Sequence, residues 1–324
     1  MTALDLPEGR RRTRVAVALG GGGARGYAHI GVLQVLEECG YEIVSIAGSS
    51  MGALVGGLHA AGGLEAFTAW VRGLRQRDVL RLYDVAPRAP GAIRAEKIFA
   101  RVSDIVGDAR IEDLPLAFTA VATDLEAGEE RWFQEGRVDA AVRASVALPV
   151  FMTPVVIDGR LLADGGLLNP LPLAPLVTAG ADLTVAVAVS GPHRAPAVPA
   201  AVPRPRGGSR GDVVLRGIAT RLAALRSAAP GPAAEDVVAE ETVLEALPAG
   251  LRTLDVMELS LEAVRTAVMR HTLAAHPPDV LITVPRSSCR TLDFHRADEM
   301  IGLGRLLALE ALDRAENRSS RCGT

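Results

Sequence analysis

The sequence has few of the features that indicate disulfide-rich, metal-binding or membrane-spanning proteins. Its three cysteines, Cys39, Cys289 and Cys322, are odd in number, far apart and without metal-ligand spacing, so we expect neither a disulfide framework nor a bound metal. No segment approaches about 18 uninterrupted apolar residues, the length typical of a transmembrane helix. The first apolar run, "VAVAL", is also shorter than the core of a signal peptide, about 7–15 residues. We therefore expect a cytoplasmic protein without a transmembrane span.

A strong excess of charge of one sign is also absent. The net charge is −3 and the pI is near 6.1, which predicts no general attraction to nucleic acid, although "RRRTR" near the start is locally basic. Of the 324 residues, 49% are hydrophobic and 23% are charged. This composition is sufficient for a large buried core and fits one large domain or two small ones.

Short apolar runs alternate with longer helical patterns along the chain. One such pattern is "AHIGVLQVLEECG", in which apolar residues recur near helical spacing before a final glycine. The alternation predicts βαβ units and a mainly parallel sheet covered by helices. In such sheets, ligands and chemistry gather at the carboxyl ends of the strands. The apolar runs lie at residues 14–19, 42–48, 116–125, 182–189 and 279–285.

A stretch rich in Pro, Ala, Gly and charged residues interrupts this alternation at about residues 190–250. We interpret it as a partly disordered insertion within one domain that spans residues 14–314 and resumes with a last strand and helix at 279–314. Residues 1–13 are then a basic N-terminal tail, and residues 315–324 are a C-terminal tail. Inside the insertion, "VVLRGIATRLAALR" predicts a basic amphipathic helix.

The segment "VAVALGGGGARGYAHIGVLQVL" indicates a strand, a glycine loop and a helix. Gly21, Gly23 and Gly26 match G-x-G-x-x-G, but a dinucleotide site also needs an acidic residue roughly 20 positions later, after the second strand. That strand ends in Ser49 and Ser50 instead, and no Lys-Ser or Lys-Thr pair follows the glycines, as a phosphate loop requires. A third interpretation is an oxyanion hole, because backbone amides of such a loop can bind any developing negative charge. A tight turn without a ligand is the fourth.

The string "GSSMG" at residues 48–52 lies between the second strand and a run of small residues typical of a helix. A serine in G-x-S-x-G at such a junction forms a nucleophile elbow, in which a sharp turn lifts the hydroxyl above the sheet. Ser50 is therefore the candidate nucleophile, with Gly48 and Gly52 on either side and Ser49 as a spacer.

A serine hydroxyl needs a base that takes its proton. None of the six histidines follows a strand in a glycine-bracketed turn, and His193, the only serious candidate for a triad, opens the insertion. Asp164, in "DGG", follows the apolar run "RLLA" and can act as the base if it is partly desolvated and touches the hydroxyl. Asp158, in "IDG", is expected to be an ordinary turn residue.

The strings "GGGGARG", "GSSMG", "ATDLEAGEE" and "RASVALPVFMTPVVIDGRLLADGGLLNPLPL" together resemble the patatin-like phospholipase family in its bacterial single-domain form. The resemblance covers about residues 14–190 and resumes at 279–310. It implies a three-layer α/β/α sandwich with a mainly parallel sheet. It also implies a Ser-Asp dyad that hydrolyses acyl esters of phospholipids or lysophospholipids without a metal or a cofactor. The partner is then a lipid or a membrane surface, which the protein meets from the water side.

The resemblance also assigns roles by motif, with Ser50 as the nucleophile and Asp164 as the base. Arg25 stabilises the glycine loop by bonding carbonyl groups, or it orients a phosphate head group. The implied oxyanion loop consists of Gly21, Gly22, Gly23, Ala24, Arg25 and Gly26, and the motif of the base is completed by Gly165 and Gly166.

Two matters are open at this point. The insertion has no counterpart among the motifs, and we expect about residues 194–247 to form a mobile flap that faces lipid. The alternatives to an acyl hydrolase are a dinucleotide-binding enzyme, which rests on G-x-G-x-x-G alone, and a non-catalytic regulatory protein of the same fold, against which Ser50 and Asp164 argue.

Overall fold

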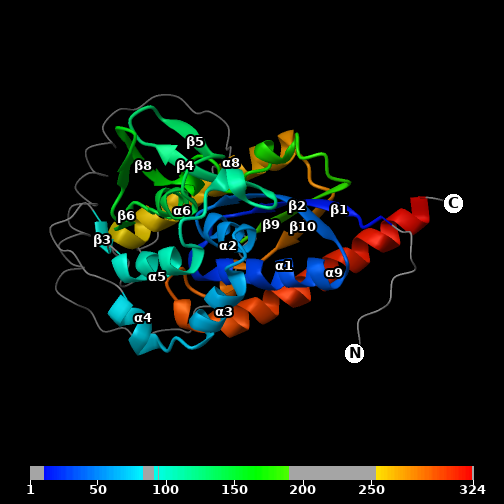
Figure 1. The fold of residues 1–324 in the computed structure, drawn as a ribbon, viewed down its shortest axis with the longest axis horizontal. Helices are drawn as coiled ribbons and strands as arrows, with labels where there is room; N and C mark the ends of the chain where they lie inside the picture. Colours follow the sequence, from blue (N-terminus) through cyan, green and yellow to red (C-terminus); the bar gives the residue numbers. More distant parts are fainter. Residues whose placement is uncertain (1–10, 83–90, 94, 190–252, 323–324) are drawn as a thin grey trace, which may run out of the picture. The chain divides into compact units, whose positions relative to one another are not determined.

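The computed structural model describes residues 11–82, 91–93, 95–189 and 253–322. The expected insertion, with its amphipathic helix, the expected flap and His193, lies outside these residues, as do residues 1–10 of the N-terminal tail. The described part of the chain alternates strands and helices around one large sheet (Figure 1).

All five strands expected from the sequence are present, as β1, β2, β4, β9 and β10. The strands are β1 (Arg14–Leu19), β2 (Glu42–Ser49), β3 (Gly91–Ile93), β4 (Ala117–Asp124), β5 (Glu129–Phe133), β6 (Val150–Met152), β7 (Val155–Ile157), β8 (Arg160–Asp164), β9 (Leu183–Ala188) and β10 (Val280–Thr283). The α-helices are α1 (Ala28–Glu38), α2 (Met51–Ala60), α3 (Leu64–Arg72), α4 (Gln76–Leu82), α5 (Glu96–Val106), α6 (Val138–Ser145), α8 (Thr253–Ala275) and α9 (Ala297–Cys322). The short 3-10 helices next to the site are η1 (Gly23–Tyr27), η3 (Gly165–Leu167) and η6 (Phe294–Arg296).

The large sheet has the strand order β10-β9-β1-β2-β4-β8-β7, and β5 also pairs with β4. The pairs from β10 to β4 along this order are parallel, whereas β5 and β8 run antiparallel to β4, and β7 runs antiparallel to β8. The prediction of a mainly parallel sheet is therefore confirmed. β3 and β6 form a separate two-stranded sheet.

The side chains of β1 explain why the two faces of the sheet carry different layers. Val15, Val17 and Leu19 point into the larger hydrophobic core, which includes residues of α1, α2 and α9. Ala16 and Ala18 point to the opposite face, where a smaller core includes the segment 171–176 and the packed side of α8. Alanine on this face leaves room for a layer that approaches closely. The sheet thus lies between α8 on one side and α1, α2 and α9 on the other (Figure 1), which is an α/β/α sandwich.

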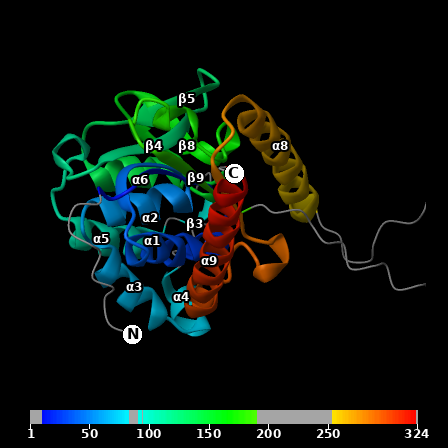
Figure 2. The same cartoon turned by 90° about the vertical axis from the view of Figure 1, so that its right-hand side faces the viewer.

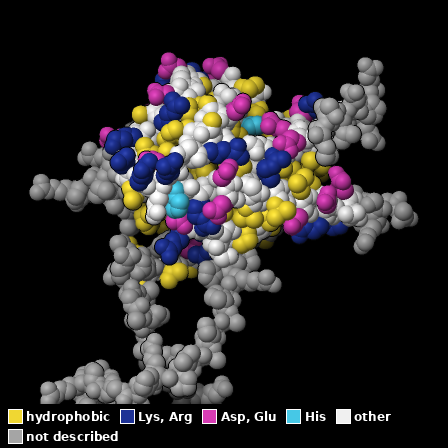
Figure 3. Space-filling view, turned by 90° about the horizontal axis from the view of Figure 1, so that it is seen from below, with side chains coloured by type: hydrophobic (Ala, Val, Ile, Leu, Met, Phe, Trp, Pro, Cys, Tyr) yellow, Lys and Arg dark blue, Asp and Glu magenta, His cyan; other side chains and the backbone are white. Residues whose placement is uncertain are grey.

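The helices α1 and α9 pack against each other at very short range (Figure 2). A methyl group at Gly304 of α9 would collide with the backbone carbonyl of Ala28, and one at Gly31 of α1 would collide with the carbonyl of Ile301. Only glycine permits this distance between the two backbones. At the rim of the same contact, Arg305 Nη2 forms an ion pair with Glu38 Oε2 at 2.6 Å. Figure 3 shows basic and acidic side chains interspersed on the face seen from below.

Two features of the C-terminal third differ from the sequence-based expectation. The helix α8 begins at Thr253, between the expected insertion and the expected last strand, where the sequence predicts no element, and its Met269 and Leu273 pack against the smaller core. The helix α9 continues to Cys322, so it includes residues 315–322 of the expected C-terminal tail. Both helices are stabilised by apolar side chains that contact a remote layer of the fold. Local composition does not reveal such contacts, which is why the sequence did not predict α8 or the last part of α9.

Candidate active site

Ser50 lies at the junction of β2 and α2, at the position of a nucleophile elbow. Its backbone has φ 55° and ψ −122°, a conformation that residues other than glycine rarely adopt. The amide of Ser50 donates to Ser145 Oγ at 2.9 Å, and that hydroxyl donates to the carbonyl of Val121 at 2.5 Å. These bonds link the strained turn to α6 and β4, so the serine is held in one orientation. It is buried, with 8% of its surface exposed.

Gly48 and Gly52 are both required by the sharpness of this turn. A methyl group at Gly52 would collide with the carbonyl oxygen of Leu19, at the end of β1. A methyl group at Gly48 would collide with the backbone of Gly52 and Ala53. The pattern G-x-S-x-G is therefore imposed by backbone contacts on both sides of Ser50.

Asp164 is brought to the site by the register of three strands. Ser49 of β2 pairs with Val121 of β4, and the next residue of β4, Ala122, pairs with Asp164 at the end of β8. Only β4 therefore separates the serine turn from the aspartate. The structure thus places the two candidate catalytic residues on either side of one strand.

The Asp164 carboxyl is fully buried, and burial raises its pKa above the ordinary value for aspartate. Three neighbours act in the opposite direction: the Arg265 cation, the Ser50 side chain and the amide of Gly166. The Gly166 amide donates to Oδ1 at 2.7 Å. Among the described residues Oδ2 has no donor at full hydrogen-bond geometry, although the Ser50 hydroxyl is close enough to lower the pKa of the carboxyl. The arrangement suits a base that can accept one proton.

The two glycines after Asp164 allow the chain to cross the end of β4. A methyl group at Gly165 would collide with the carbonyl of Val121 and would lie 2.9 Å from Ser49 Oγ. A methyl group at Gly166 would collide with Arg265 Nη2. "DGG" thus marks a point where the backbone of β4 and the side chains of Ser49 and Arg265 lie close to the chain, rather than a free surface turn.

The glycine loop lies on the other side of Ser50, between β1 and η1. The amide of Gly21 donates to the carbonyl of Pro170 at 3.1 Å, and that of Ala24 donates to the carbonyl of Thr291 at 2.9 Å. For the amides of Gly22 and Gly23 we find no acceptor in the described part of the chain. Both residues line the same pocket as Ser50. Gly26 lies so close to the elbow that a methyl group there would collide with Met51 Cβ.

Two buried basic residues hold this loop in place. His29 Nε2 lies 2.7 Å from the carbonyl of Gly20, and since a carbonyl only accepts, Nε2 carries the proton. Burial lowers the pKa of His29 from 6.5 to about 4, so the ring is neutral. Arg25 Nη1 donates to the carbonyls of Arg286 and Cys289, each at 3.4 Å. Arg25 thus bonds carbonyl groups, but those of the C-terminal segment rather than of its own loop.

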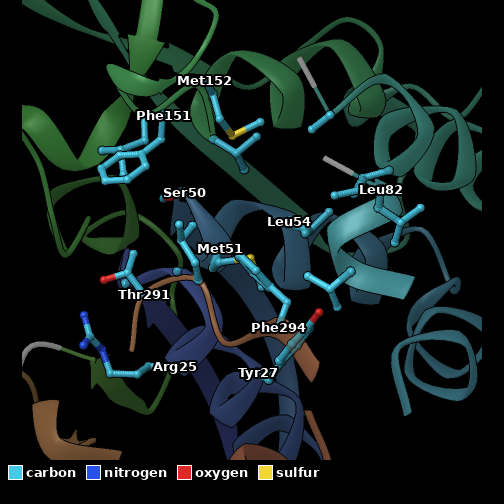
Figure 4. Close-up of a pocket in the computed structure, with 18 of the residues that line it drawn as sticks. Arg25, Tyr27, Ser50, Met51, Leu54, Leu82, Phe151, Met152, Thr291 and Phe294 are labelled. Atoms are coloured by element: carbon cyan, nitrogen blue, oxygen red, sulfur yellow. The ribbon is translucent and has the colours of Figure 1, made fainter. Parts of the chain in front are cut away.

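A large apolar pocket opens beside Ser50 (Figure 4). Its walls are mostly apolar and suit the hydrocarbon part of a ligand. In Figure 4, Arg25 and Thr291 lie on the same side as Ser50, and Leu82 lies on the opposite side. The apolar lining includes Met51, Leu54, Phe67, Trp70, Leu74, Val79, Leu82, Ile98, Phe99, Phe151, Met152 and Phe294.

Two charged residues of the pocket were missed at the level of sequence. Glu262 and Arg265 lie one turn apart on α8, and both are buried, with 8% and 7% of their surfaces exposed. Arg265 Nη2 lies 4.0 Å from Asp164 Oδ1. A signal for them exists in "LSLEAVRTAVMRH", where two charged residues interrupt the apolar side of an amphipathic helix. Charged residues on the buried side of a helix often indicate a functional site.

The remaining expected residues are placed as follows. Asp158 occupies the turn between β7 and β8 with φ 51°, as expected of an ordinary turn residue. Among the described residues, no cluster of His, Cys, Asp and Glu is arranged to hold a metal ion. Within the same part of the chain, no helix has both the length and the apolarity needed to span a bilayer.

Comparison with known proteins agrees with this geometry. A model of the family described as patatin-like phospholipase matches residues 17–177. The chain belongs to the patatin-like phospholipase family, which places it in the class of lipid acyl hydrolases. It is similar to uncharacterized NTE family proteins of Mycobacterium tuberculosis and Mycobacterium bovis, each 46% identical over 337 residues, with 95% of this chain and 94% of theirs covered.

More distant relatives share only part of the chain. Patatin-like phospholipase domain-containing protein 7 of Mus musculus is 35% identical over 182 residues, and lysophospholipase nte1 of Emericella nidulans is 32% identical over 193 residues. Each match covers 54% of this chain but only 13% and 12% of those longer proteins. Among solved structures, VipD from Legionella pneumophila matches with a TM-score of 0.49 and 16% identity, covering 94% of this chain and 67% of that chain.

Proposed function

We propose that the protein is a serine hydrolase that cleaves acyl ester bonds of phospholipids or lysophospholipids through a Ser50-Asp164 dyad. The observation that carries the proposal is the position of Ser50, at a strained elbow that lines an apolar pocket, only one strand away from the buried Asp164 carboxyl. An isolated nucleophile without a base would not support it, since a serine hydroxyl is unreactive until its proton is removed.

In the first half-reaction, Asp164 takes the hydroxyl proton as Ser50 Oγ attacks the acyl carbon. The amides of Gly22 and Gly23, which have no acceptor among the described residues, donate to the oxyanion that forms on the former carbonyl oxygen. The partial positive charge at the start of α2 adds to this stabilisation. The bond to the alcohol then breaks, and Asp164 returns the proton to the leaving oxygen.

In the second half-reaction, water replaces the alcohol. Asp164 takes a proton from the water, whose oxygen attacks the acyl-enzyme, and collapse of the new intermediate releases the fatty acid and returns the proton to Ser50. The apolar pocket supports this assignment because it offers space for the acyl chain.

The choice of a lysophospholipid or a phospholipid as substrate rests on the relatives. A fungal relative is named a lysophospholipase, and mammalian relatives are named for a patatin-like phospholipase domain. We therefore propose phospholipase A or lysophospholipase activity on lipid presented at a membrane surface or in a micelle.

A fluorophosphonate probe with an alkyl chain tests the proposal directly, because it forms a covalent bond only with an activated serine. We expect labelling of the wild type at Ser50, no labelling of Ser50→Ala, and labelling slowed by about 100-fold or more in Asp164→Asn, the usual loss with a general base. Ser49→Ala is the control and should still be labelled. Equal labelling of Asp164→Asn and wild type would overturn the dyad, and an unlabelled wild type would overturn the hydrolase.

A further inference from the structure

Arg265 is a buried cation for which we find no hydrogen bond among the described residues. Its side chain is 9% exposed, it lines the pocket, and its Nε has no partner in the described part of the chain. A guanidinium has five N–H donors, yet in the described part of the chain the ion-pair partner of Arg265, Asp164 Oδ1, lies 4.0 Å from Nη2. That distance is too long for a hydrogen bond. A buried cation without hydrogen bonds is costly, which indicates a position kept for a ligand.

The neighbouring arginines are accommodated by the protein itself. Arg25 donates to two backbone carbonyls, and Arg286 Nε lies 3.7 Å from Glu262 Oε1. The described charged residues that line the pocket are two arginines, Arg25 and Arg265, and one carboxylate, Glu262. The excess is positive, and Arg265 is the arginine whose donors are free to serve an anion.

Arg265 is also close to the reacting serine. A single methyl group placed on Gly21 would lie 2.7 Å from Arg265 Nη2 and 3.1 Å from Ser50 Cβ. The guanidinium and the Ser50 side chain thus both border the same small space next to Gly21. A ligand whose ester is at Ser50 can reach Arg265 with a group only a few bonds away.

We propose that Arg265 binds the phosphate group of the lipid substrate, so that the enzyme prefers phosphate-bearing acyl esters to neutral ones. This inference rests on the proposed function and specifies the part of the substrate next to the scissile ester. Phosphate is the fitting anion because its oxygens accept parallel hydrogen bonds from a guanidinium. In a lysophospholipid the acyl chain occupies the apolar pocket, the ester lies at Ser50, and the phosphate lies a few bonds further on, at α8.

A binding experiment tests the site without turnover. In the Ser50→Ala background, calorimetry compares dodecyl phosphate with inorganic phosphate and with dodecanol. We expect dodecyl phosphate to bind most tightly, and Arg265→Gln to weaken its binding about ten- to a hundredfold, the usual effect of losing a charged hydrogen bond. Arg270→Gln, an exposed arginine on the same helix, is the matched control and should leave the binding unchanged. Equal affinity for inorganic phosphate would assign the site to free phosphate instead, and unchanged binding in Arg265→Gln would overturn it.

A kinetic experiment separates phosphate binding from any effect of Arg265 on Asp164. The readout is the ratio of kcat/KM for a lysophosphatidic acid to kcat/KM for the monoacylglycerol with the same chain, both measured at the same pH. A change in the base affects both substrates and cancels in the ratio, whereas loss of phosphate binding lowers the ratio, by about tenfold or more in Arg265→Gln. An unchanged ratio would overturn the inference while the proposed hydrolase stands. A wild type that cleaves neither ester would instead contradict the proposed function, and the calorimetry would still decide the phosphate site.

Discussion

At the residue scale, Asp164 shows burial and charge acting on one carboxyl in opposite directions. Burial raises its pKa, and the Arg265 cation, the Ser50 side chain and the Gly166 amide lower it. A base that is fully buried without such neighbours would hold its proton at neutral pH and could not activate a serine. These three neighbours are therefore as necessary for the proposed role of Asp164 as a base as the carboxyl itself.

The pH dependence of hydrolysis should report this balance. Because only the ionised Asp164 accepts a proton, kcat/KM should fall as the pH falls through a pKa that lies above the ordinary 3.8 of aspartate. Removal of the nearby cation in Arg265→Gln should raise that pKa, so the acid limb moves to higher pH. A pH series on a soluble neutral ester, with Arg270→Gln as control, measures the shift. An acid limb that stays in place would show that Arg265 does not act on Asp164.

The pKa of His29 also depends on two opposing effects, because burial lowers it and the hydrogen bond to the carbonyl of Gly20 raises it. Burial is the larger effect, so the ring stays neutral. Its pKa in the folded protein is about 4, and in the unfolded chain it is near 6.5. The unfolded chain therefore binds a proton first as the pH falls. The stability that neutral His29 contributes is complete above pH 6.5 and is lost progressively towards pH 4.

This loss predicts a specific difference between the wild type and His29→Gln, which keeps an amide donor for the carbonyl of Gly20. Over the interval from pH 6.5 to 4, the free energy of unfolding of the wild type should fall by about 3 kcal/mol relative to that of the variant. Urea unfolding of both proteins at several pH values measures the gap. A gap that does not change with pH would mean that His29 is not held neutral in the folded protein.

At the element scale, the contact of α1 with α9 controls the position of the glycine loop. The loop leads through η1 into α1, and α9 contacts both of these elements. Gly31 and Gly304 permit backbone contact between the two helices. The oxyanion loop is thus supported by a helix that begins more than 250 residues later in the chain.

Two glycines of α9 lie only two positions apart, and replacing each by alanine should change the free energy of unfolding in opposite directions. Gly304→Ala places a methyl group against the backbone of Ala28 and should lower the free energy of unfolding by about 1–3 kcal/mol or more. Gly302 is exposed, with no atom near an added methyl group, and Gly302→Ala should raise it by about 0.5–1 kcal/mol. Thermal or urea unfolding distinguishes the two. Equal effects would show that α9 does not approach α1 as closely as described.

At the scale of the whole molecule, the pocket is assembled from segments that are far apart in sequence. It is lined by the elbow and α2, by α3, α4 and α5, by β6, and by α8 and η6. The length of acyl chain that fits is therefore a property of the assembled fold. It depends most on the residues furthest from Ser50.

Leu82, on the opposite side of the pocket from Ser50 in Figure 4, gives a test of acyl-chain selection. Leu82→Trp should fill the distal part of the pocket and lower the ratio of kcat/KM for a palmitate ester to that for a butyrate ester by about tenfold or more. Leu80→Trp, on the same helix but 64% exposed and outside the pocket, is the control. If Leu82→Trp affects both esters equally, the acyl chain does not reach α4.

The sequence by itself determined the five strands β1, β2, β4, β9 and β10, the mainly parallel sheet, the family, and the candidates Ser50 and Asp164, because these depend on short-range signals. Periodicity, glycine spacing and the motifs around Ser50 and Asp164 are all readable within a few residues. Only the tertiary structure decided that His29 holds the glycine loop, that α8 exists beside the sheet, and that Arg265 faces the pocket. The physical reason is distance along the chain. Arg265 is 101 residues from Asp164 in sequence, and its chemistry depends on a 4.0 Å contact that packing alone creates.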